Sequence, residues 1–443
     1  MHTYECYKDS GYNWLGKIPI NWSMESFKNI LNERNEKNDP IKTDERLSLS
    51  IDKGVTSYND KTTNLDRFKD DVSQYKLAHK GDLVFNSMNM IVGALGVSNY
   101  YGCVSPVYYT YYSKHNSTKF YEYFFRNKNI QGVLYSMGKG LLAIDRGDGK
   151  YNTLRLKVSR DDLRSFKIPL PPIHEQEAIA NFLDDKTAKI DALVQTKEQQ
   201  IEKLKELRQA KIHQAVTKGL DANAPTKNSG VEWIGEIPEH WEVKRLKNIL
   251  SSKLKYGANE SGYEYDVNLS RYIRISDFGY DGKLNESKKL SLPDNIAKDY
   301  LLKDGDILFA RSGATVGKAY QFKTSLGTEK SYCYAGYLIK AEPDTNQILS
   351  DFLNFYTQSG AFMNWKDSIF NKATIENIGA DKYSELLVPI PPIQEQEQIV
   401  AYLDEVTGKI DEAIAQKQEQ ITKLKEYKQS LINNVVTGKV KVC

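Results

Sequence analysis

The chain has 443 residues, 40% of them hydrophobic and 27% charged, which is typical of a globular protein with more than one core. It contains no apolar stretch long enough for a membrane span, no secretory signal pattern, and four scattered cysteines without a zinc motif or disulfide framework, so we expect a cytoplasmic protein. The formal net charge of +3 neither requires nor excludes a nucleic-acid partner.

The first recognisable block of the chain returns near its middle. Residues 10–31 align with residues 229–250, and 11 of the 22 positions are identical. A second block, residues 169–217, returns as residues 389–437 with 25 of 49 positions identical. Chance does not produce two such matches at almost the same offset, so the chain is a tandem duplication.

The interiors between these blocks, residues 32–168 and 251–388, have nearly equal length but share little sequence. One clear correspondence joins the β-type run Gly81–Phe85 to Gly305–Phe309, and another β-type run covers Tyr332–Ile339. Mixed with short helical runs, these predict an α+β class. Connectors usually diverge first, so alike connectors around unlike interiors favour functional divergence over the alternative, neutral drift.

The loops after the two Gly-Asp-X-X-Phe strands are candidate DNA contacts. Residues 86–89 (NSMN) take the place that residues 310–313 (ARSG) have in the second half. In the major groove, Asn most naturally contacts adenine and Arg most naturally contacts guanine. Different polar residues at the same structural position are what the recognition of two different DNA half-sites would require. An ordinary loop role stays open for each residue. The candidate DNA-binding residues are Asn86, Ser87, Asn89, Arg146, Lys150, Arg311, Ser312, Lys318 and Lys372.

Residues 174–218 and their copy in the second half predict two long amphipathic helices. Each follows a Pro-Pro pair, apolar residues recur at steps of three and four, and only Gly408 interrupts the second. A narrow stripe cannot stabilise a lone helix, so the two copies should pair, and antiparallel pairing gives a pseudo-two-fold arrangement. The predicted pairing residues are Leu183, Ile190, Val194, Ile201, Leu204, Leu403, Ile410, Ile414, Ile421 and Leu424.

Charge also separates the helices from the rest of the chain. The two helical segments carry 16 acidic and 13 basic residues, a net −3, which leaves +6 for the globular parts. We therefore expect that any polyanion would bind the globular parts rather than the helices. Long basic side chains that fall on the apolar stripes, such as Lys197, Arg208, Lys417 and Lys428, can extend out of the seam or contact partners.

We find no catalytic or metal-binding pattern in the sequence. Residues 313–319 are one residue short between the glycines of a phosphate loop and lack Ser or Thr after the lysine. His174-Glu175 has no second histidine in metal-binding spacing, and the Asn-Pro-Pro-aromatic motif of amino-methyltransferases does not occur. We therefore expect a chain without an active site, a metal or a cofactor of its own.

The whole pattern resembles the specificity subunits of type I restriction-modification systems. The similar motifs are the domain starts at residues 14–22 and 233–241, Gly305–Arg311, the proline-led block at residues 168–177, and Ala215–Gly219. The resemblance covers essentially the whole chain and occurs in both halves, which makes it more specific than any single motif.

This resemblance implies an α+β chain with two globular target recognition domains joined by two long antiparallel coiled-coil helices. The expected segments are a first recognition domain at 1–170, a central helix at 171–220, a second recognition domain at 221–388 and a distal helix at 389–443. Each recognition domain would read half of a bipartite, asymmetric site in double-stranded DNA. The helices would fix the spacer and dock two methyltransferase subunits.

The resemblance also implies two restriction subunits, which supply the motor and nuclease. S-adenosylmethionine, ATP and Mg²⁺ would then be bound by partner subunits, and no membrane would be involved. A coiled-coil adaptor that binds two proteins without DNA specificity would explain the duplication and the helices equally well. It would not explain why both globular parts resemble recognition domains.

Overall fold

The computed structural model describes residues 2–60, 71–141, 155–279, 283–312, 316–370 and 377–442. The chain forms two compact units: unit 1 comprises residues 1–197 and 419–443, and unit 2 comprises residues 198–418. Each long helix therefore contributes to both units. The predicted segments at 1–170, 171–220, 221–388 and 389–443 instead keep the helices apart from the globular parts.

Unit 1 begins with short strands and ends in the first long helix. Its elements in chain order are β1 Tyr7–Asp9, β2 Lys17–Pro19, β3 Ser23–Ser26, α1 Phe27–Ile30, β4 Asn32–Glu33, β5 Leu47–Ser50, β6 Gly54–Ser57, β7 Lys76–Ala78, β8 Leu83–Asn86, the 3-10 turn η1 Met90–Val92, β9 Leu95–Val97, β10 Gly102–Val104, β11 Tyr108–Tyr112, α2 Thr118–Arg126, α3 Lys128–Met137, β12 Lys139–Leu141, β13 Arg155–Lys157, α4 Arg160–Ser165, β14 Lys167–Leu170 and α5 Ile173–Lys218.

Unit 2 repeats this order with an insertion. Its elements are β15 Thr226–Asn228, β16 Glu236–Pro238, β17 Glu242–Arg245, η2 Leu246–Asn248, β18 Lys255–Tyr256, β19 Tyr263–Glu264, β20 Ser270–Ile273, β21 Leu290–Leu292, α6 Asp294–Ala297, η3 Lys298–Tyr300, β22 Ile307–Ala310, β23 Ala319–Gln321, η4 Thr324–Leu326, β24 Tyr332–Tyr334, β25 Leu338–Ala341, α7 Ser350–Thr357, α8 Gly360–Phe370, α9 Ala380–Ser384, β26 Leu387–Ile390 and α10 Ile393–Val436.

Both units contain the same four-stranded antiparallel sheet. The strand order is β4-β11-β8-β9 in unit 1 and β18-β25-β22-β23 in unit 2. The Gly-Asp-X-X-Phe runs form the inner strands β8 and β22, so the predicted equivalence of these runs is structural. The last strand of each globular part also pairs with an early one, β14 with β3 and β26 with β17.

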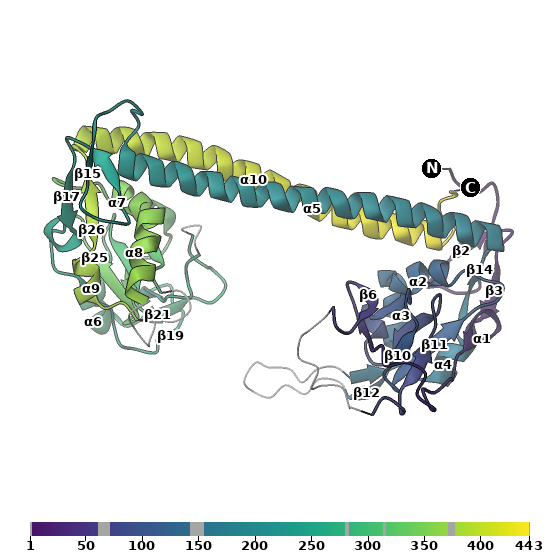
Figure 1. Ribbon diagram of the computed structural model, residues 1–443. Helices are drawn as coiled ribbons and strands as arrows, with labels where there is room; N and C mark the ends of the chain where they lie inside the picture. Colours follow the sequence, from purple (N-terminus) through teal and green to yellow (C-terminus); the bar gives the residue numbers. More distant parts are fainter. Residues whose placement is uncertain are drawn as a thin grey trace. The chain divides into compact units, whose positions relative to one another are not determined.

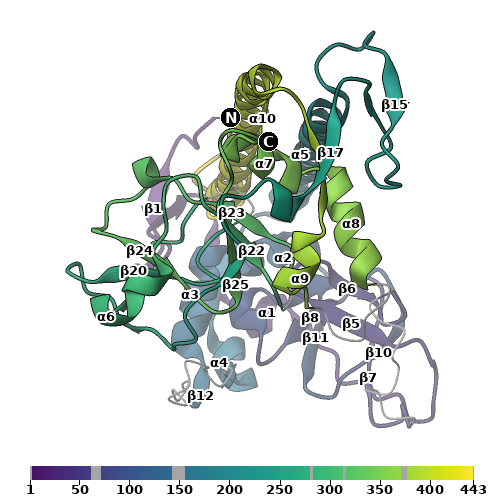
Figure 2. The ribbon, with the colours of Figure 1, turned by 90° about the vertical axis from the view of Figure 1, so that its left-hand side faces the viewer.

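The predicted divergence of the interiors lies in what is added to this common sheet. Unit 1 adds the two-stranded pairs β5–β6 and β7–β10. Unit 2 adds a second four-stranded sheet, β19-β21-β20-β24, in which β20 and β24 are parallel. Figure 2 shows this second sheet, with β20 and β24, beside α6 in unit 2.

The segment 221–230, whose composition is typical of a linker, contains a strand in the structure. Within it, β15 pairs with β16 from Thr226 with Pro238 to Asn228 with Glu236. The equivalent pair at the N-terminus is β1 with β2. The polar composition is compatible with a strand here because all three residues of β15 are exposed.

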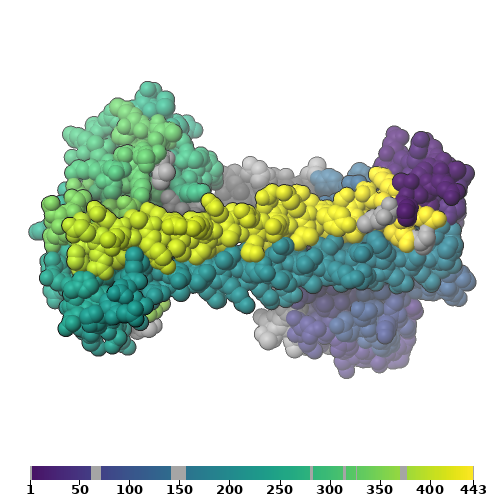
Figure 3. All heavy atoms as spheres, turned by 90° about the horizontal axis from the view of Figure 1, so that it is seen from above, coloured from purple at the N-terminus to yellow at the C-terminus, as the bar shows by residue number. Residues whose placement is uncertain are grey.

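The long helices α5 and α10 run antiparallel in both units. As the residue number rises along α5, that of its partner falls along α10, and the views in Figures 1 and 3 show the two helices side by side. The polar pairs across the seam are Asp191–Lys428 (2.7 Å) and Lys197–Gln420 (2.6 Å) in unit 1, and Gln200–Lys417 (2.7 Å) and Arg208–Asp411 (3.1 Å) in unit 2. The predicted antiparallel pairing is confirmed.

The predicted pairing residues lie along this seam. Seven of them are buried (Leu183, Ile190, Val194, Ile201, Leu403, Ile410 and Ile421), and three are half-buried (Leu204, Ile414 and Leu424). The basic residues on the stripe extend past the apolar side chains and bind polar groups of the opposite helix, as snorkelling predicts. Neither long helix, nor any other helix in the described ranges, is long and apolar enough to cross a bilayer.

The core of unit 2 extends from the sheet to both long helices without a break. One cluster of buried residues joins Phe309 of β22, Phe352 of α7, Val216 of α5 and Leu403 of α10. The other face of β22 carries Leu308, which packs in a separate cluster against the second sheet. Because β22 is buried on both faces, its four residues form one continuous apolar run.

A glutamate, buried in α5 and half-buried in α10, joins each globular part to the start of its long helix. In the first turn of α5, the Glu175 carboxylate accepts hydrogen bonds from the Trp22 indole (2.8 Å), the Tyr4 hydroxyl (3.0 Å) and the Asn21 amide. In α10, Glu395 accepts a bond from the Trp241 indole (3.0 Å) and contacts His240 (2.8 Å). The two repeated blocks of the sequence therefore contact each other in both units.

A buried glutamine follows each of these glutamates. Gln176 accepts a hydrogen bond from the Ser117 backbone N–H, just before α2, and donates to the Pro171 carbonyl. Gln396 accepts from the Leu349 N–H, just before α7, and donates to the Pro391 carbonyl. The Glu-Gln pair thus positions the helix start against two separate parts of the globular domain.

We predict that Glu175→Gln destabilises unit 1, because one amide oxygen replaces a carboxylate that accepts three hydrogen bonds in a buried site. We expect the free energy of unfolding of unit 1 to fall by about 1–3 kcal/mol. Hydrogen exchange of the amides in β2 and β3 measures it locally. Glu177→Gln, on the same helical turn but exposed, is the matched control and should change exchange little. Equal effects of the two substitutions would contradict the anchoring role.

Candidate nucleic-acid interface

In each unit the end of the inner strand, β8 or β22, meets the residues just before α4 or α9. In unit 1 the Val158 N–H donates to the Ser87 carbonyl (3.2 Å), and in unit 2 the Ile378 N–H donates to the Arg311 carbonyl (2.8 Å). Strand register agrees, since Asn86 faces Tyr108 and Ala310 faces Leu338. Ser87 and Arg311 are therefore at equivalent positions. We use the name loop edge for the surface where the end of β8 or β22 meets the residues just before α4 or α9.

The loop edge of unit 2 is built around Arg311. Its guanidinium carbon lies 4.9 Å from the centre of the Tyr256 ring, and its backbone N–H donates to the Tyr337 carbonyl (3.1 Å). The Tyr256 hydroxyl accepts a hydrogen bond from the Ala380 N–H (2.9 Å) at the start of α9. Tyr256 and Tyr337 are both exposed. The half-buried Arg311 thus lies against the ring of an exposed tyrosine.

The loop edge of unit 1 contains a similar stack made from different positions. Arg160 of α4 lies over the Tyr109 ring, 4.9 Å from its centre. Arg160 forms an ion pair with Glu33 at 2.9 Å, whereas no carboxylate of the described residues lies within ion-pair distance of Arg311. Tyr109 also donates to the Val158 carbonyl (3.2 Å), and burial raises the pKa of its hydroxyl. Both loop edges therefore contain an arginine that lies on a tyrosine ring, but the arginine of unit 1 is paired with a carboxylate.

The predicted DNA-binding residues fall into three groups. Asn89 is exposed, and Asn86, Arg311 and Ser312 are half-buried at the loop edges. Ser87 and Lys318 are buried, so their side chains are not offered to a macromolecule in this conformation. Arg146, Lys150 and Lys372 lie outside the described residues.

Two of these side chains are engaged within the protein. The Asn86 side-chain oxygen accepts a hydrogen bond from the Met88 N–H (3.1 Å). The Lys318 ammonium donates to the Phe278 carbonyl and lies 4.8 Å from the centre of the Phe278 ring. Lys318 therefore connects β23 to the insertion of unit 2.

The aspartates of the Gly-Asp-X-X-Phe runs support the loop edges from inside. Asp82 is buried and paired with Arg34 (2.6 Å), whereas Asp306 is buried and paired with Lys340 (3.3 Å). Burial raises the pKa of Asp306, against the opposing effect of its hydrogen bond from the Lys303 N–H and of Lys340. Each carboxylate also caps the turn before its strand, which fixes where the strand starts.

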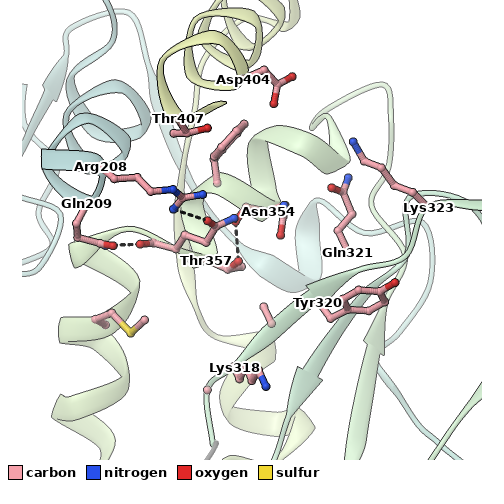
Figure 4. A pocket seen from close by; sticks show the side chains of 15 residues that line it. Arg208, Gln209, Lys318, Tyr320, Gln321, Lys323, Asn354, Thr357, Asp404 and Thr407 are labelled. Carbon is pink, nitrogen blue, oxygen red and sulfur yellow. Dashed lines mark hydrogen bonds between the residues drawn. The ribbon is translucent and has the colours of Figure 1, made fainter. Parts of the chain in front are cut away.

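A cleft of about 360 Å³ opens in unit 2 where α7 and β23 meet the long helices (Figure 4). Arg208 of α5 reaches into it and donates to the Gln358 side chain (3.1 Å), and Thr407 of α10 faces it. Unit 1 has a corresponding cleft of about 420 Å³ lined by the equivalent residues Lys428 and Thr187. These paired clefts lie at the junction of globular part and helices, apart from the residues that define the loop edges.

A family model described as the type I restriction modification DNA specificity domain matches residues 19–203 and again residues 238–423. The chain belongs to this family. The prediction of a DNA specificity subunit with two tandem recognition domains is thereby confirmed.

Individual relatives agree with this assignment. The putative type I restriction enzyme MjaX specificity subunit of Methanocaldococcus jannaschii is 24% identical over 97% of this chain and 96% of its own length. The MjaVIII specificity subunit of the same organism is 27% identical, but the match covers only 64% of each chain. The EcoBI specificity subunit of Escherichia coli is 26% identical over 64% of this chain and 60% of its own length.

Solved structures share the fold at low sequence identity. A chain from a study of complex assembly and conformational transition of the type I R-M system has a TM-score of 0.70, with 16% identity, over 96% of this chain and 99% of its own. The HsdS subunit from Thermoanaerobacter tengcongensis has a TM-score of 0.52, also with 16% identity, over 98% and 100%.

Sequence patterns in this family member did not identify Tyr256, Tyr337 or Arg160 as parts of the loop edges. Tyr256 is distant in sequence from Arg311 and meets it only because β18 and β22 both flank β25. The place of Arg160 at the loop edge could have been suspected, because Arg160 closely follows Val158, which is the equivalent of Ile378 before α9. No local signal pairs it with Tyr109.

We predict that Lys340→Met destabilises unit 2 by about 3 kcal/mol, because it leaves the Asp306 carboxylate buried without its cation. The pKa of Asp306 is already raised, so its folded-state pKa exceeds the unfolded value. The loss should therefore be larger at about pH 7 than at about pH 5, where protonation relieves the buried charge. Hydrogen exchange in β22 at both pH values measures the difference.

Lys303→Met is the matched control, because Lys303 pairs with Glu342 at the surface of the same unit. It should leave exchange in β22 unchanged at both pH values. A pH-independent effect of Lys340→Met, or an equal effect of the control, would show that the Asp306 pair does not support the strand.

Proposed function

We propose that this chain is the DNA-reading, non-catalytic subunit of a type I restriction-modification complex. The observation that carries the proposal is the repetition of one sheet, with its helix anchor, under two loop edges of different chemistry. A protein that reads two different half-sites needs one scaffold and two unlike surfaces. The bipartite, asymmetric site would then be read in one half by unit 1 and in the other by unit 2.

The partners follow from the same proposal. Two methyltransferase subunits would bind the chain and methylate adenine with S-adenosylmethionine, and restriction subunits would use ATP and Mg²⁺. The assembly would work in the cytoplasm on double-stranded DNA. The relatives named as specificity subunits support this, as does a structural neighbour solved in a study of the assembly of a type I system.

An adaptor that binds two proteins without DNA specificity is the alternative from the sequence. The loop edges disfavour it, because stacked Arg–Tyr pairs and exposed tyrosines suit nucleic-acid contacts. Salt-dependent binding to duplex DNA, alone and with the methyltransferase subunits, distinguishes the two functions. Binding that does not respond to salt, or no binding even with the partners, would exclude the proposed function.

We predict that sequencing of methylated adenines in host DNA shows a bipartite motif that disappears when this chain is absent. Exchange of residues 251–388 for the same part of another family member should change only one half of that motif. The unexchanged half is the internal control, because it is read by unit 1. A change in both halves would refute modular reading, and the absence of any motif would refute the function.

A second prediction concerns the helices. α5 and α10 each continue from one unit into the other, so we propose that their length fixes the spacer. Deleting residues 198–204 together with residues 414–420 removes two facing turns and keeps the apolar spacing. The spacer should shorten by about three base pairs, since seven residues span about 10 Å of helix.

Deletion of residues 198–204 alone is the matched control. It shifts α5 against α10 and separates cross-helix pairs such as Arg208–Asp411, so assembly should fail. If the double deletion assembles and methylates a motif with the original spacer, helix length does not set the spacing.

A further inference from the structure

We propose that Arg311 binds a backbone phosphate of the DNA at the half-site read by unit 2. The inference rests on the proposed function and adds the contact made by one side chain. The sequence alone favours guanine as the partner of an arginine at this position. The charge environment in the structure favours phosphate instead.

Among the described residues of unit 2, Arg311 is the arginine without a carboxylate partner. Residues 198–418 contain five arginines. Four of them form ion pairs with carboxylates: Arg208 with Asp411, Arg245 with Glu385, Arg271 with Glu286 and Glu329, and Arg274 with Asp277. Within the described part of the chain, Arg311 has no carboxylate within ion-pair distance. Since a guanidinium stays charged at any ordinary pH, this is a standing positive charge.

The Arg311 side chain is held in one orientation by its neighbours. The Tyr256 ring supports the plane of the guanidinium, and the Ala380 N–H holds the Tyr256 hydroxyl. The backbone N–H and carbonyl of Arg311 are both hydrogen-bonded, so the loop is fixed independently of the side chain. The Nε atom of Arg311 has no hydrogen-bond partner among the described residues. Because Nε is buried, a ligand would meet the two terminal nitrogens of the guanidinium.

A phosphate fits this arrangement better than a base edge. A half-buried guanidinium has lost part of its hydration, and an anion with two acceptor oxygens compensates it through a bidentate pair. A guanine edge offers two acceptors but no negative charge. In unit 1 the equivalent position is the buried Ser87, and Arg160 at that edge is already paired with Glu33. The proposed contact therefore belongs to unit 2 alone.

The test uses the full chain in complex with its methyltransferase subunits and a duplex that carries the methylated motif. The slope of log affinity against log salt concentration counts phosphate contacts, at about 0.9 per phosphate. Arg311→Gln should lower the slope by about one and weaken binding about tenfold at low salt, with the methylated motif unchanged. Arg311→Lys keeps the charge and should restore most of the slope.

Arg245→Gln is the matched control, because Arg245 is paired with Glu385, which retains Lys247 as a partner. Its salt slope should equal that of the unsubstituted complex. Tyr256→Leu should weaken binding with the slope retained, and it should have no further effect when combined with Arg311→Gln. That pattern would identify Tyr256 as a positioning residue, and it provides a second readout if Arg311→Gln folds poorly, which thermal unfolding detects.

Two results would overturn the inference. An unchanged slope with relaxed methylation at one base position would identify Arg311 as a base contact, and an unchanged slope with an unchanged motif would remove it from the DNA interface. Either result would leave the proposed function intact, because that function is tested on the unsubstituted complex, by its salt-dependent binding to DNA and its specific methylated motif.

Discussion

In each unit a glutamate and a buried glutamine, both in the first turn of a long helix, bind two separate segments of the globular part. Glu175 and Gln176 do this in α5, and Glu395 and Gln396 do it in α10. Loss of one partner leaves buried donors unpaired, and such a loss costs more than the bond itself contributes. The position of the globular part on its own helix pair therefore depends on a few side chains that cannot change independently.

This constraint accounts for the distribution of sequence identity along the chain. The two repeated blocks are distant in sequence, but they contribute opposite sides of the same anchor. The loop edges take no part in the anchor, and the common sheet holds them through buried strands and through a buried aspartate. The cation that pairs with that aspartate already differs, Arg34 in unit 1 and Lys340 in unit 2. Side chains beyond the strand ends are therefore free to diverge without loss of the scaffold.

The parts of the fold that were predictable are those set by local periodicity. The predicted helix at 174–218 is α5 Ile173–Lys218, and the predicted strand at Gly81–Phe85 is β8 Leu83–Asn86. Long-range pairing was not predictable. The run Tyr332–Ile339 forms two strands, because the Gly336 N–H bonds to the Ala258 carbonyl and the chain turns there. For the same reason the sequence did not predict that the Lys318 ammonium binds the Phe278 carbonyl.

The net positive charge of the globular parts is a poor guide to where an anion would bind, since many cations of the described regions are paired with carboxylates. The two loop edges differ in whether their arginine is paired with a carboxylate of the described residues. Arg160 lies on a tyrosine and is neutralised by Glu33, whereas Arg311 lies on a tyrosine with no such partner in the described chain. An asymmetric DNA site requires two surfaces that differ in more than shape. Among the described residues, the difference is a carboxylate that pairs with Arg160 and has no counterpart beside Arg311, so a positioned positive charge lies on one side of a scaffold that is otherwise repeated.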